Sequence, residues 1–492
     1  MCHTPRMPAP GAILAALALI AGLGIVGTPP VQAASALSWQ ACASADLEGF
    51  DCATLVRPLD RAKPGGASVR LAVVRLPATG TAEQRIGTLF MNPGGPGGSG
   101  LEAASTGMLL PPEVRASFDF VTWDPRGIGS STPAIIDCLA PMPARPATGK
   151  VNWQRVLDQR IRDLGRINRE CYKTNRTVIE HAGTLDNAYD LDALRAAVGD
   201  EKLTYWGISY GTMLGSTYAQ LFPDRVRALV MDSNVDPQTT LAALSAGGPA
   251  PDHSIGFYLE TNSLDDSLKQ VLAALDKRTI ALPDGTRYTR WDLLDVVAPM
   301  VTTPSAWPIA KAAIEDSWLA VFSTGPTREA ARQRLTAPKL QSPTTDQNAG
   351  VFSAILCQDF ADRISRLEMR ERLNWSVREG PLYGGSLVVD FLAACSGYEA
   401  AKPDPVPSPL AYGPDVPGLI LNATRDGSTP YQWAVNMARV YRQMRMVTMA
   451  SGYHALYMFT GSSCVDDIVT QYLISASTPA IDQVCPFPVP AS

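Results

Sequence analysis

One serine lies in a glycine-flanked turn that could make its hydroxyl a nucleophile. Residues 207–211 read Gly-Ile-Ser-Tyr-Gly, directly after the short apolar run 203–206 and at the start of a helical pattern that reaches Leu221. A strand, a tight turn and a helix in this order push the serine side chain out above the sheet edge, and the helix N-terminus favours negative charge that develops nearby. We therefore predict Ser209 as a nucleophile rather than as an ordinary capping serine.

Such a serine needs a base, and this chain offers few, because its four histidines are His3, His181, His253 and His454. His3 falls within an N-terminal leader. His454 follows the predicted strand 446–449 in a Gly-Tyr-His loop, and it is the only histidine at a strand end beyond the serine. We predict His454 as the base.

The acid that orients the histidine is expected between serine and histidine along the chain. Asp426 lies just past the predicted strand 418–422, where a buried carboxylate could hold one imidazole nitrogen and stabilise the imidazolium. The alternative is Asp232, just past the strand 227–231. We favour Asp426 over Asp232.

A glycine-rich loop could supply backbone N–H groups that stabilise the negative charge on a substrate oxygen. Residues 92–100 read Asn-Pro-Gly-Gly-Pro-Gly-Gly-Ser-Gly and directly follow an apolar run. Positions without side chains let backbone N–H groups approach a substrate oxygen, so we assign oxyanion donors to Gly95 and to Tyr210, the residue after the serine. The loop contains no lysine and fails the dinucleotide pattern, which excludes phosphate cradling and predicts no cofactor. No His-x-x-x-His or Cys-x-x-Cys spacing occurs, so no metal site is expected.

The elements around these residues alternate between strand and helix patterns. Strands are predicted at 69–74, 87–92, 118–123, 203–206 and 227–231, and a helix at 184–198. This alternation predicts a mostly parallel sheet with helices on both faces. Residues 238–405 are mainly helical in pattern, so we expect a core formed by 34–237 and 406–492 with a helical insertion between its two parts.

The N-terminus has the features of an export signal. Residues 1–33 combine a weakly basic start, an apolar run and Val31-Gln32-Ala33 before the expected cleavage point. The apolar run is shorter than the roughly 20 residues that cross a bilayer, and no later stretch is suitable. We expect a secreted or periplasmic protein without stable membrane insertion.

The formal charge of −5, from 42 Lys and Arg against 47 Asp and Glu, argues against a nucleic-acid binder.

Cysteine usage agrees with export. Of nine cysteines, Cys2 leaves with the leader, and the remaining eight form an even set in an oxidising compartment. Loop-closure entropy favours sequence neighbours as partners. The expected disulfides are Cys42–Cys52, Cys138–Cys171, Cys357–Cys395 and Cys464–Cys485.

The motifs together resemble one family. The loop 92–100, the segment 123–131 (Trp-Asp-Pro-Arg-Gly-Ile-Gly-Ser-Ser), the serine turn and the Asp426/His454 tail look like the secreted tripeptidyl aminopeptidase branch of the α/β-hydrolases, which is similar to the prolyl aminopeptidases. The likeness extends to 354–359 and to the C-terminal region 418–485. It implies an α/β-hydrolase fold with a helical cap, and Ser209, Asp426 and His454 as the triad.

The resemblance implies peptide substrates with a free N-terminus, whose ammonium group calls for carboxylates on the cap. Asp359, Glu315 and Asp316 are the candidates from the sequence. Two other functions remain open: a secreted carboxylesterase with the same triad, and a non-catalytic binding protein with a hydrolase fold. The oligomeric state is not predicted.

Overall fold

The structure is a computed structural model that describes residues 36–136, 138, 141, 143–336, 347–398, 403–406 and 413–488. The leader expected at 1–33 lies outside the described residues. Within the described ranges, no helix combines the length and apolarity that a membrane crossing needs.

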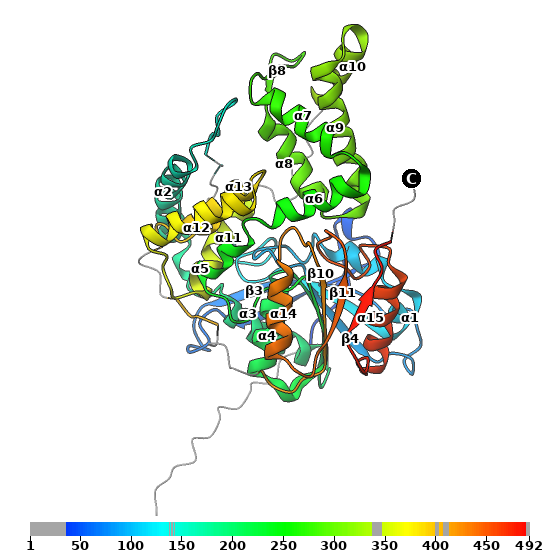
Figure 1. The fold of residues 1–492 in the computed structure, drawn as a ribbon. Helices are drawn as coiled ribbons and strands as arrows, with labels where there is room; N and C mark the ends of the chain where they lie inside the picture. Colours follow the sequence, from blue (N-terminus) through cyan, green and yellow to red (C-terminus); the bar gives the residue numbers. More distant parts are fainter. Residues whose placement is uncertain are drawn as a thin grey trace, which may run out of the picture.

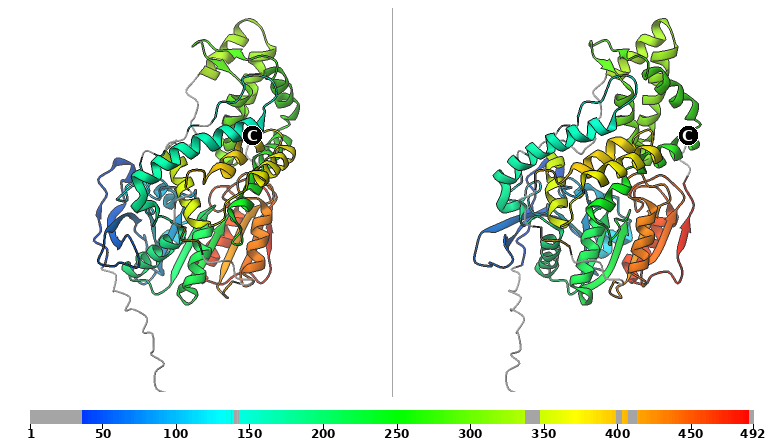
Figure 2. Two further views of the ribbon diagram at one scale, coloured as in Figure 1. Left: turned by 90° about the vertical axis from the view of Figure 1, so that its left-hand side faces the viewer. Right: turned by 60° about the vertical axis from the view of Figure 1, so that its left-hand side comes forward.

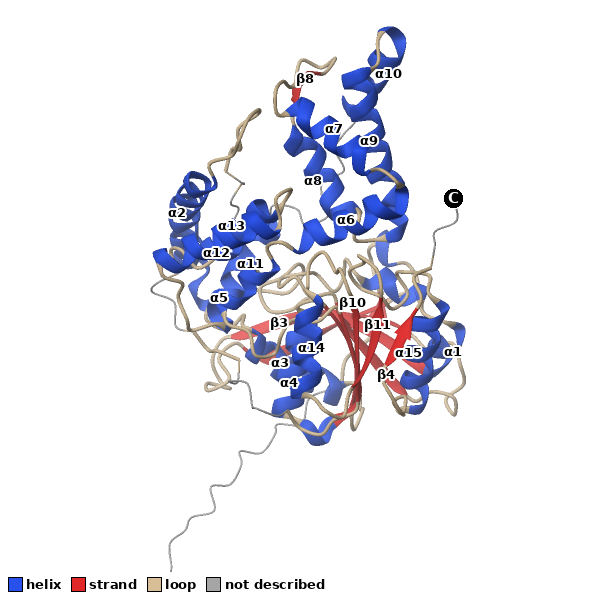
Figure 3. Ribbon diagram, in the orientation of Figure 1, coloured by secondary structure: helices blue, strands red, loops and turns tan. Residues whose placement is uncertain are grey.

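A ten-stranded sheet forms the centre of the described chain (Figure 1, Figure 3). Its strands, in chain order, are β1 (Gln40–Ala41), β2 (Asp51–Pro58), β3 (Ser68–Leu76), β4 (Gly87–Asn92), β5 (Phe118–Trp123), β6 (Leu203–Ile208), β7 (Val226–Asp232), β10 (Gly418–Ala423), β11 (Arg445–Met449) and β12 (Gln483–Cys485). They lie side by side in the order β1-β2-β3-β5-β4-β6-β7-β10-β11-β12. The strands from β5 to β12 in this order pair in parallel, whereas β1, β2 and β3 pair antiparallel at one edge. The predicted sheet class is confirmed.

The central strands are buried on both faces, which explains their continuous apolar sequences. In β4, Leu89 and Met91 join a core cluster with side chains of α1 (Pro112–Ser117) and α15 (Ser463–Ser475). Phe90 points to the opposite face and packs with α3 (Thr184–Ala197), α4 (Gly211–Leu221) and α14 (Tyr431–Val440). Successive side chains thus bury against two separate helical layers.

A long helical insertion separates β7 from β10 and divides into two parts (Figure 1). We call the first part the tower; it consists of α6 (Ala250–Asn262), α7 (Asp265–Leu275), α8 (Arg290–Met300), α9 (Trp307–Phe322), α10 (Gly325–Thr336) and the small hairpin of β8 (Ile280–Ala281) and β9 (Arg287–Tyr288). It stands away from the sheet in all three ribbon views (Figure 2).

The second part packs together with α2 (Trp153–Ile179), a helix that lies outside the insertion in the chain, and we call this set of helices the lower layer. It consists of α2, α5 (Leu241–Leu244), α11 (Gln347–Asp359), α12 (Arg366–Glu379) and α13 (Gly384–Ala393). The long helix α2 precedes β6 in the chain but packs against α11 and α13. A division of the sequence into 34–237 and 238–405 places α2 with the core, because chain order does not show which helices share a layer.

Four disulfides are present, between Cys42 and Cys52, Cys138 and Cys171, Cys357 and Cys395, and Cys464 and Cys485. They are the neighbour pairs that loop-closure entropy favours. Two of them stabilise the lower layer, because one joins α2 to the loop after β5 and another joins α11 to the end of α13.

Candidate active site

Ser209 occupies a turn between β6 and α4 that only small neighbours permit. Its φ of +56° lies in the left-handed region, which is costly for a residue with a side chain. A Cβ on Gly207 would lie 2.5 Å from the Gly211 carbonyl oxygen, and one on Gly211 would lie 2.6 Å from the Asn92 carbonyl oxygen. Any larger residue at either glycine of the G-x-S-x-G pattern would therefore collide with the backbone. The turn exposes Ser209 to a cavity.

His454 lies in the loop after β11 and lines the same cavity as Ser209. Its Nδ1 is 2.9 and 3.1 Å from the two carboxylate oxygens of Asp426, which is 1% exposed. Asp426 also accepts hydrogen bonds from the backbone N–H groups of Ser428 (2.8 Å) and Thr429 (2.9 Å). This arrangement fixes the carboxylate and occupies Nδ1, so Nε2 is the imidazole nitrogen that remains for another partner.

The electrostatics of His454 suit a base. Burial lowers the pKa of His454, but the charge and hydrogen bond of Asp426, together with the charge of Asp232, outweigh this and raise it above its usual 6.5. Asp232, the alternative acid, makes no hydrogen bond to the imidazole. It accepts from the backbone N–H groups of Leu456 (2.8 Å) and Tyr457 (3.0 Å), and burial raises its pKa to about 6. Asp232 thus holds the chain just beyond His454.

The glycine loop lies against the serine turn. Gly95 and Gly97 have φ values of +114° and +99°, and a Cβ on Gly94 would lie 2.8 Å from the Tyr210 nitrogen. Gly95 and Tyr210 both line the cavity, and in the described residues no hydrogen bond occupies either backbone N–H. Both residues that the sequence suggested as oxyanion donors therefore line the cavity that contains Ser209, and their backbone N–H groups have no other acceptor among the described residues.

The cavity measures about 540 Å³ and its remaining wall comes largely from the lower layer. The apolar part includes Leu164, Phe352, Leu356, Leu387 and Phe391. Two charged residues interrupt this wall, Arg160 of α2 and Asp390 of α13, and neither was among the residues singled out from the sequence. An acidic residue inside the apolar run Gly384–Ala393 was the signal that could have identified Asp390.

Asp390 is held in a defined orientation. Arg160 is 4% exposed and donates from Nε to Oδ1 of Asp390 (2.6 Å), while its Nη1 donates to the Pro141 carbonyl (2.8 Å). The Asp390 side chain keeps 32% of its surface exposed. Burial raises the pKa of Asp390, and the charge and hydrogen bond of Arg160 oppose that rise. A carboxylate in a largely apolar cavity is suited to bind a cationic group.

The three carboxylates suggested for substrate ammonium binding do not line this cavity. Asp359, the last residue of α11, is 1% exposed and accepts hydrogen bonds from Thr184 and Tyr210. Glu315 and Asp316 lie on α9 in the tower, where they pair with Lys311 and Arg334. The prediction that Asp359, Glu315 and Asp316 bind the substrate ammonium group is therefore wrong for this cavity. Sequence showed acids in a helical region but not the direction in which they point.

The base of the tower contacts the histidine loop from outside. The His454 backbone N–H donates to the Thr302 carbonyl (2.9 Å), and the Ser254 hydroxyl donates to the Gly452 carbonyl (2.7 Å). The Trp307 ring packs on Tyr453 with centroids 5.4 Å apart.

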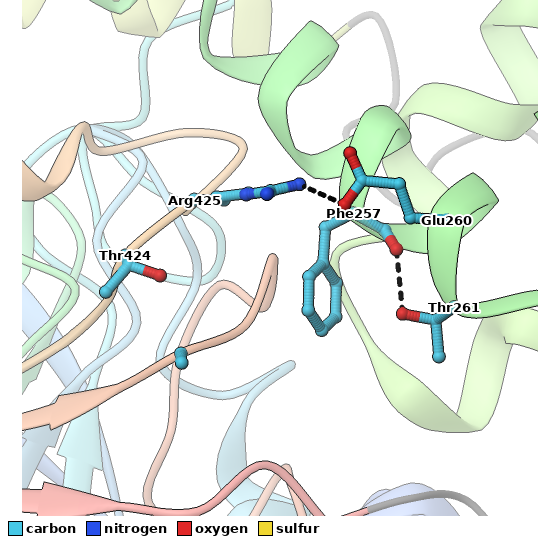
Figure 4. A pocket seen from close by; sticks show the side chains of 6 residues that line it. Phe257, Glu260, Thr261, Thr424 and Arg425 are labelled. Carbon is cyan, nitrogen blue, oxygen red and sulfur yellow. Dashed lines mark hydrogen bonds and ion pairs between the residues drawn. The ribbon is translucent and has the colours of Figure 1, made fainter.

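Beside these contacts, a shallow cavity on the outer surface lies between α6 and the Asp426 loop (Figure 4). Among the described residues, no cluster of His, Cys, Asp and Glu could hold a metal ion.

Comparison with known proteins agrees with this geometry. Residues 87–268 match a family described as the alpha/beta hydrolase fold, and residues 380–485 match one described as TAP-like protein. The serine protease Hip1 of Mycobacterium tuberculosis is 30% identical over 96% of this chain and 95% of its own, and a tripeptidyl aminopeptidase of Streptomyces coelicolor is 30% identical over 92% and 86%. Carboxylesterase B of Mycobacterium tuberculosis is 28% identical over 91% and 89%. The chain belongs to the tripeptidyl-aminopeptidase-like branch of the α/β-hydrolases.

Proposed function

We propose that this protein is an exported serine aminopeptidase that releases short peptides, tripeptides in particular, from free N-termini. The observation that carries the proposal is the single cavity that contains Ser209, His454 and the free N–H groups of Gly95 and Tyr210. The Asp426–His454 pair supports a base role for the histidine. Export is supported by the leader-like residues 1–33 and by the disulfides.

In the proposed reaction, His454 Nε2 takes the proton of the Ser209 hydroxyl while the serine oxygen attacks the scissile carbonyl carbon. The Gly95 and Tyr210 N–H groups stabilise the negative oxygen of the tetrahedral intermediate. His454 then gives its proton to the leaving amine, and the acyl-enzyme forms. Water, deprotonated by the same histidine, attacks the ester, and collapse of the second intermediate returns the proton to Ser209 and releases the peptide acid. Asp426 keeps the imidazole oriented and stabilises its cationic form.

The proposal assigns recognition of the substrate ammonium group to Asp390. It is a carboxylate on the cavity wall, and a charge-assisted hydrogen bond from an ammonium group would be strong in this apolar surrounding. The apolar side chains around it suit small apolar substrate residues between the ammonium group and the scissile bond. A blocked or internal peptide segment would offer Asp390 no ammonium group, and Arg160 would then be its charged partner.

The test uses residues 34–492 and a Ser209→Ala control, with three substrates: free Ala-Ala-Pro p-nitroanilide, its N-acetylated form, and a short p-nitrophenyl ester. We expect serine-dependent release of nitroaniline from the free peptide and at least tenfold less from the acetylated one, since a lost charged hydrogen bond costs about 1.5–3 kcal/mol. Turnover of the ester without cleavage of either peptide would instead support a carboxylesterase, the function named for one relative with 28% identity. No serine-dependent turnover of any substrate would support a binding protein.

A further inference from the structure

Asp359 is a buried carboxylate that the proposed reaction does not use. It is the last residue of α11, is 1% exposed, and lies two residues after Cys357, whose disulfide to Cys395 fixes this end of the helix. Its hydrogen-bond donors are uncharged groups of Thr184 and Tyr210, and the nearby carboxylate of Asp404 adds to the rise of its pKa. Oδ1 accepts from the Thr184 backbone N–H (2.6 Å), and Oδ2 accepts from the Thr184 hydroxyl and the Tyr210 hydroxyl (2.6 Å each).

The contact with Thr184 explains how this carboxylate is tolerated. Thr184 is the first residue of α3, and the residue before it is Gly183, which has no side chain to cap the helix. Asp359 supplies the negative charge and the acceptor that a helix N-terminus favours, from another part of the chain. Burial nevertheless raises the pKa of Asp359 to about 6, against the hydrogen bonds of Thr184 and Tyr210.

The contact with Tyr210 connects α11 to the catalytic turn. Tyr210 follows the nucleophile, and its side chain is 7% exposed. Tyr210 is the N-cap residue of α4, so its backbone N–H has no intrahelical acceptor, and the residue lines the cavity in which we propose this N–H as an oxyanion donor. A bond from its hydroxyl to Asp359 fixes the ring, and the ring limits rotation of the backbone that carries the N–H.

The same helix also packs against the glycine loop that carries Gly95, the other proposed donor. A Cβ on Gly97 would lie 3.1 Å from the Val351 side chain of α11, so this helix packs against the glycine loop as well as Tyr210. An intact pair of donors thus depends on α11 in its observed position.

We propose that Asp359 is a positioning residue for the oxyanion hole, which it stabilises by holding the Tyr210 side chain to α11 of the insertion. This inference rests on the proposed function, because it requires Tyr210 to donate its N–H to the substrate oxygen. It predicts that loss of the Tyr210 hydroxyl impairs catalysis although the hydroxyl touches no substrate. Since the oxyanion forms only in the transition state, the effect should fall on kcat rather than on KM.

The experiment compares Tyr210→Phe, Asp359→Asn and the double variant on the p-nitrophenyl ester and on the free tripeptide anilide. We expect each single change to lower kcat about tenfold with KM within twofold, less than the 10²–10³-fold that loss of an oxyanion donor costs. The double variant should be no slower than the slower single one, because both changes break the same contact. Inhibition constants for a boronic acid, whose serine adduct places an oxygen in the hole, should rise by the factor by which kcat falls.

Thr184→Val is the matched control, because it removes the other hydroxyl on the same carboxylate oxygen and keeps the bond from the Tyr210 hydroxyl to Asp359. It should lower the melting temperature and leave kcat within twofold. Tyr210→Phe with the wild-type kcat, or single effects that multiply in the double variant, would overturn the positioning role. A wild-type protein without Ser209-dependent turnover would instead overturn the proposed function, and this inference with it.

Discussion

The tower and the lower layer contact different parts of the catalytic machinery. Within the described residues, the tower contributes no side chain to the cavity, but its base holds the backbone around His454 through Thr302 and Ser254. The lower layer makes most of the wall opposite the triad and reaches Tyr210 through Asp359. The core carries Ser209, Asp426 and His454, the lower layer forms most of the remaining cavity wall, and the base of the tower supports the histidine loop. Changes in each region should therefore alter a different kinetic quantity.

The largest effect should come from a substitution in the core, which should lower kcat for every substrate. Asp426→Asn removes the charge that orients and stabilises the His454 imidazolium, so we expect kcat to fall about 10³–10⁴-fold on the peptide anilide and the ester alike. Steady-state kinetics with both substrates measure this loss.

Asp232→Asn is the matched control, because Asp232 is an equally buried carboxylate at the end of the neighbouring strand. It holds the Leu456 and Tyr457 N–H groups, so its replacement should lower stability by about 1–3 kcal/mol and reduce kcat far less than Asp426→Asn does. The reverse order of the two kcat values would make Asp232 the catalytic acid.

The lower layer should control selectivity, and Asp390→Asn tests this. Loss of the carboxylate should raise KM for the free-amine tripeptide about 10–100-fold, since a hydrogen bond between charged groups contributes about 1.5–3 kcal/mol. The acetylated peptide and the ester do not carry the ammonium group, so their kcat/KM values should change less than threefold. Equal losses on all three substrates would mean that Asp390 supports the fold rather than the substrate.

The pH dependence should follow groups of the core. His454 must be neutral to accept the serine proton, and its pKa is raised above 6.5 by Asp426 and Asp232. We expect kcat/KM to fall about tenfold per pH unit below that pKa, with full activity at neutral to alkaline pH. The residual activity of Asp426→Asn should show this acidic limb at lower pH, because removal of the anion disfavours the imidazolium. If the acidic fall of kcat/KM shifted in Asp390→Asn instead, the group that titrates would be Asp390 of the lower layer rather than His454.

The core and the insertion also differ in how much of their structure the sequence predicts. The sheet and the positions of Ser209, Asp426 and His454 could be predicted, because strand ends and tight turns are set by residues close in the chain. The disulfide partners followed for the same reason, since each joins neighbours among the cysteines. In the insertion, the sequence predicts Asp359 as a substrate-binding residue and does not indicate Asp390. The direction of a helical side chain there depends on how α11, α13 and α2 pack, and distant segments decide that.

The smallest effect should come from the outer surface of the tower's base. Arg425, the neighbour of Asp426, pairs with Glu260 of α6 at 2.7 Å beside the shallow cavity in Figure 4. The two side chains are 44% and 60% exposed, and such a pair contributes about 0.2–1 kcal/mol at most. Glu260→Gln should therefore change kcat less than twofold and leave the acidic limb unmoved.

Ser254→Ala provides the contrast, because it removes a buried bond from the same helix to the Gly452 carbonyl. That bond contributes about 0.5–1.5 kcal/mol, and we expect its loss to lower kcat a few-fold through the histidine loop, with KM for the tripeptide unchanged. If Glu260→Gln lowered kcat as much as Ser254→Ala, the exposed pair would hold the Asp426 loop. The support of the triad would then extend from the buried contacts at the base of the tower to its surface.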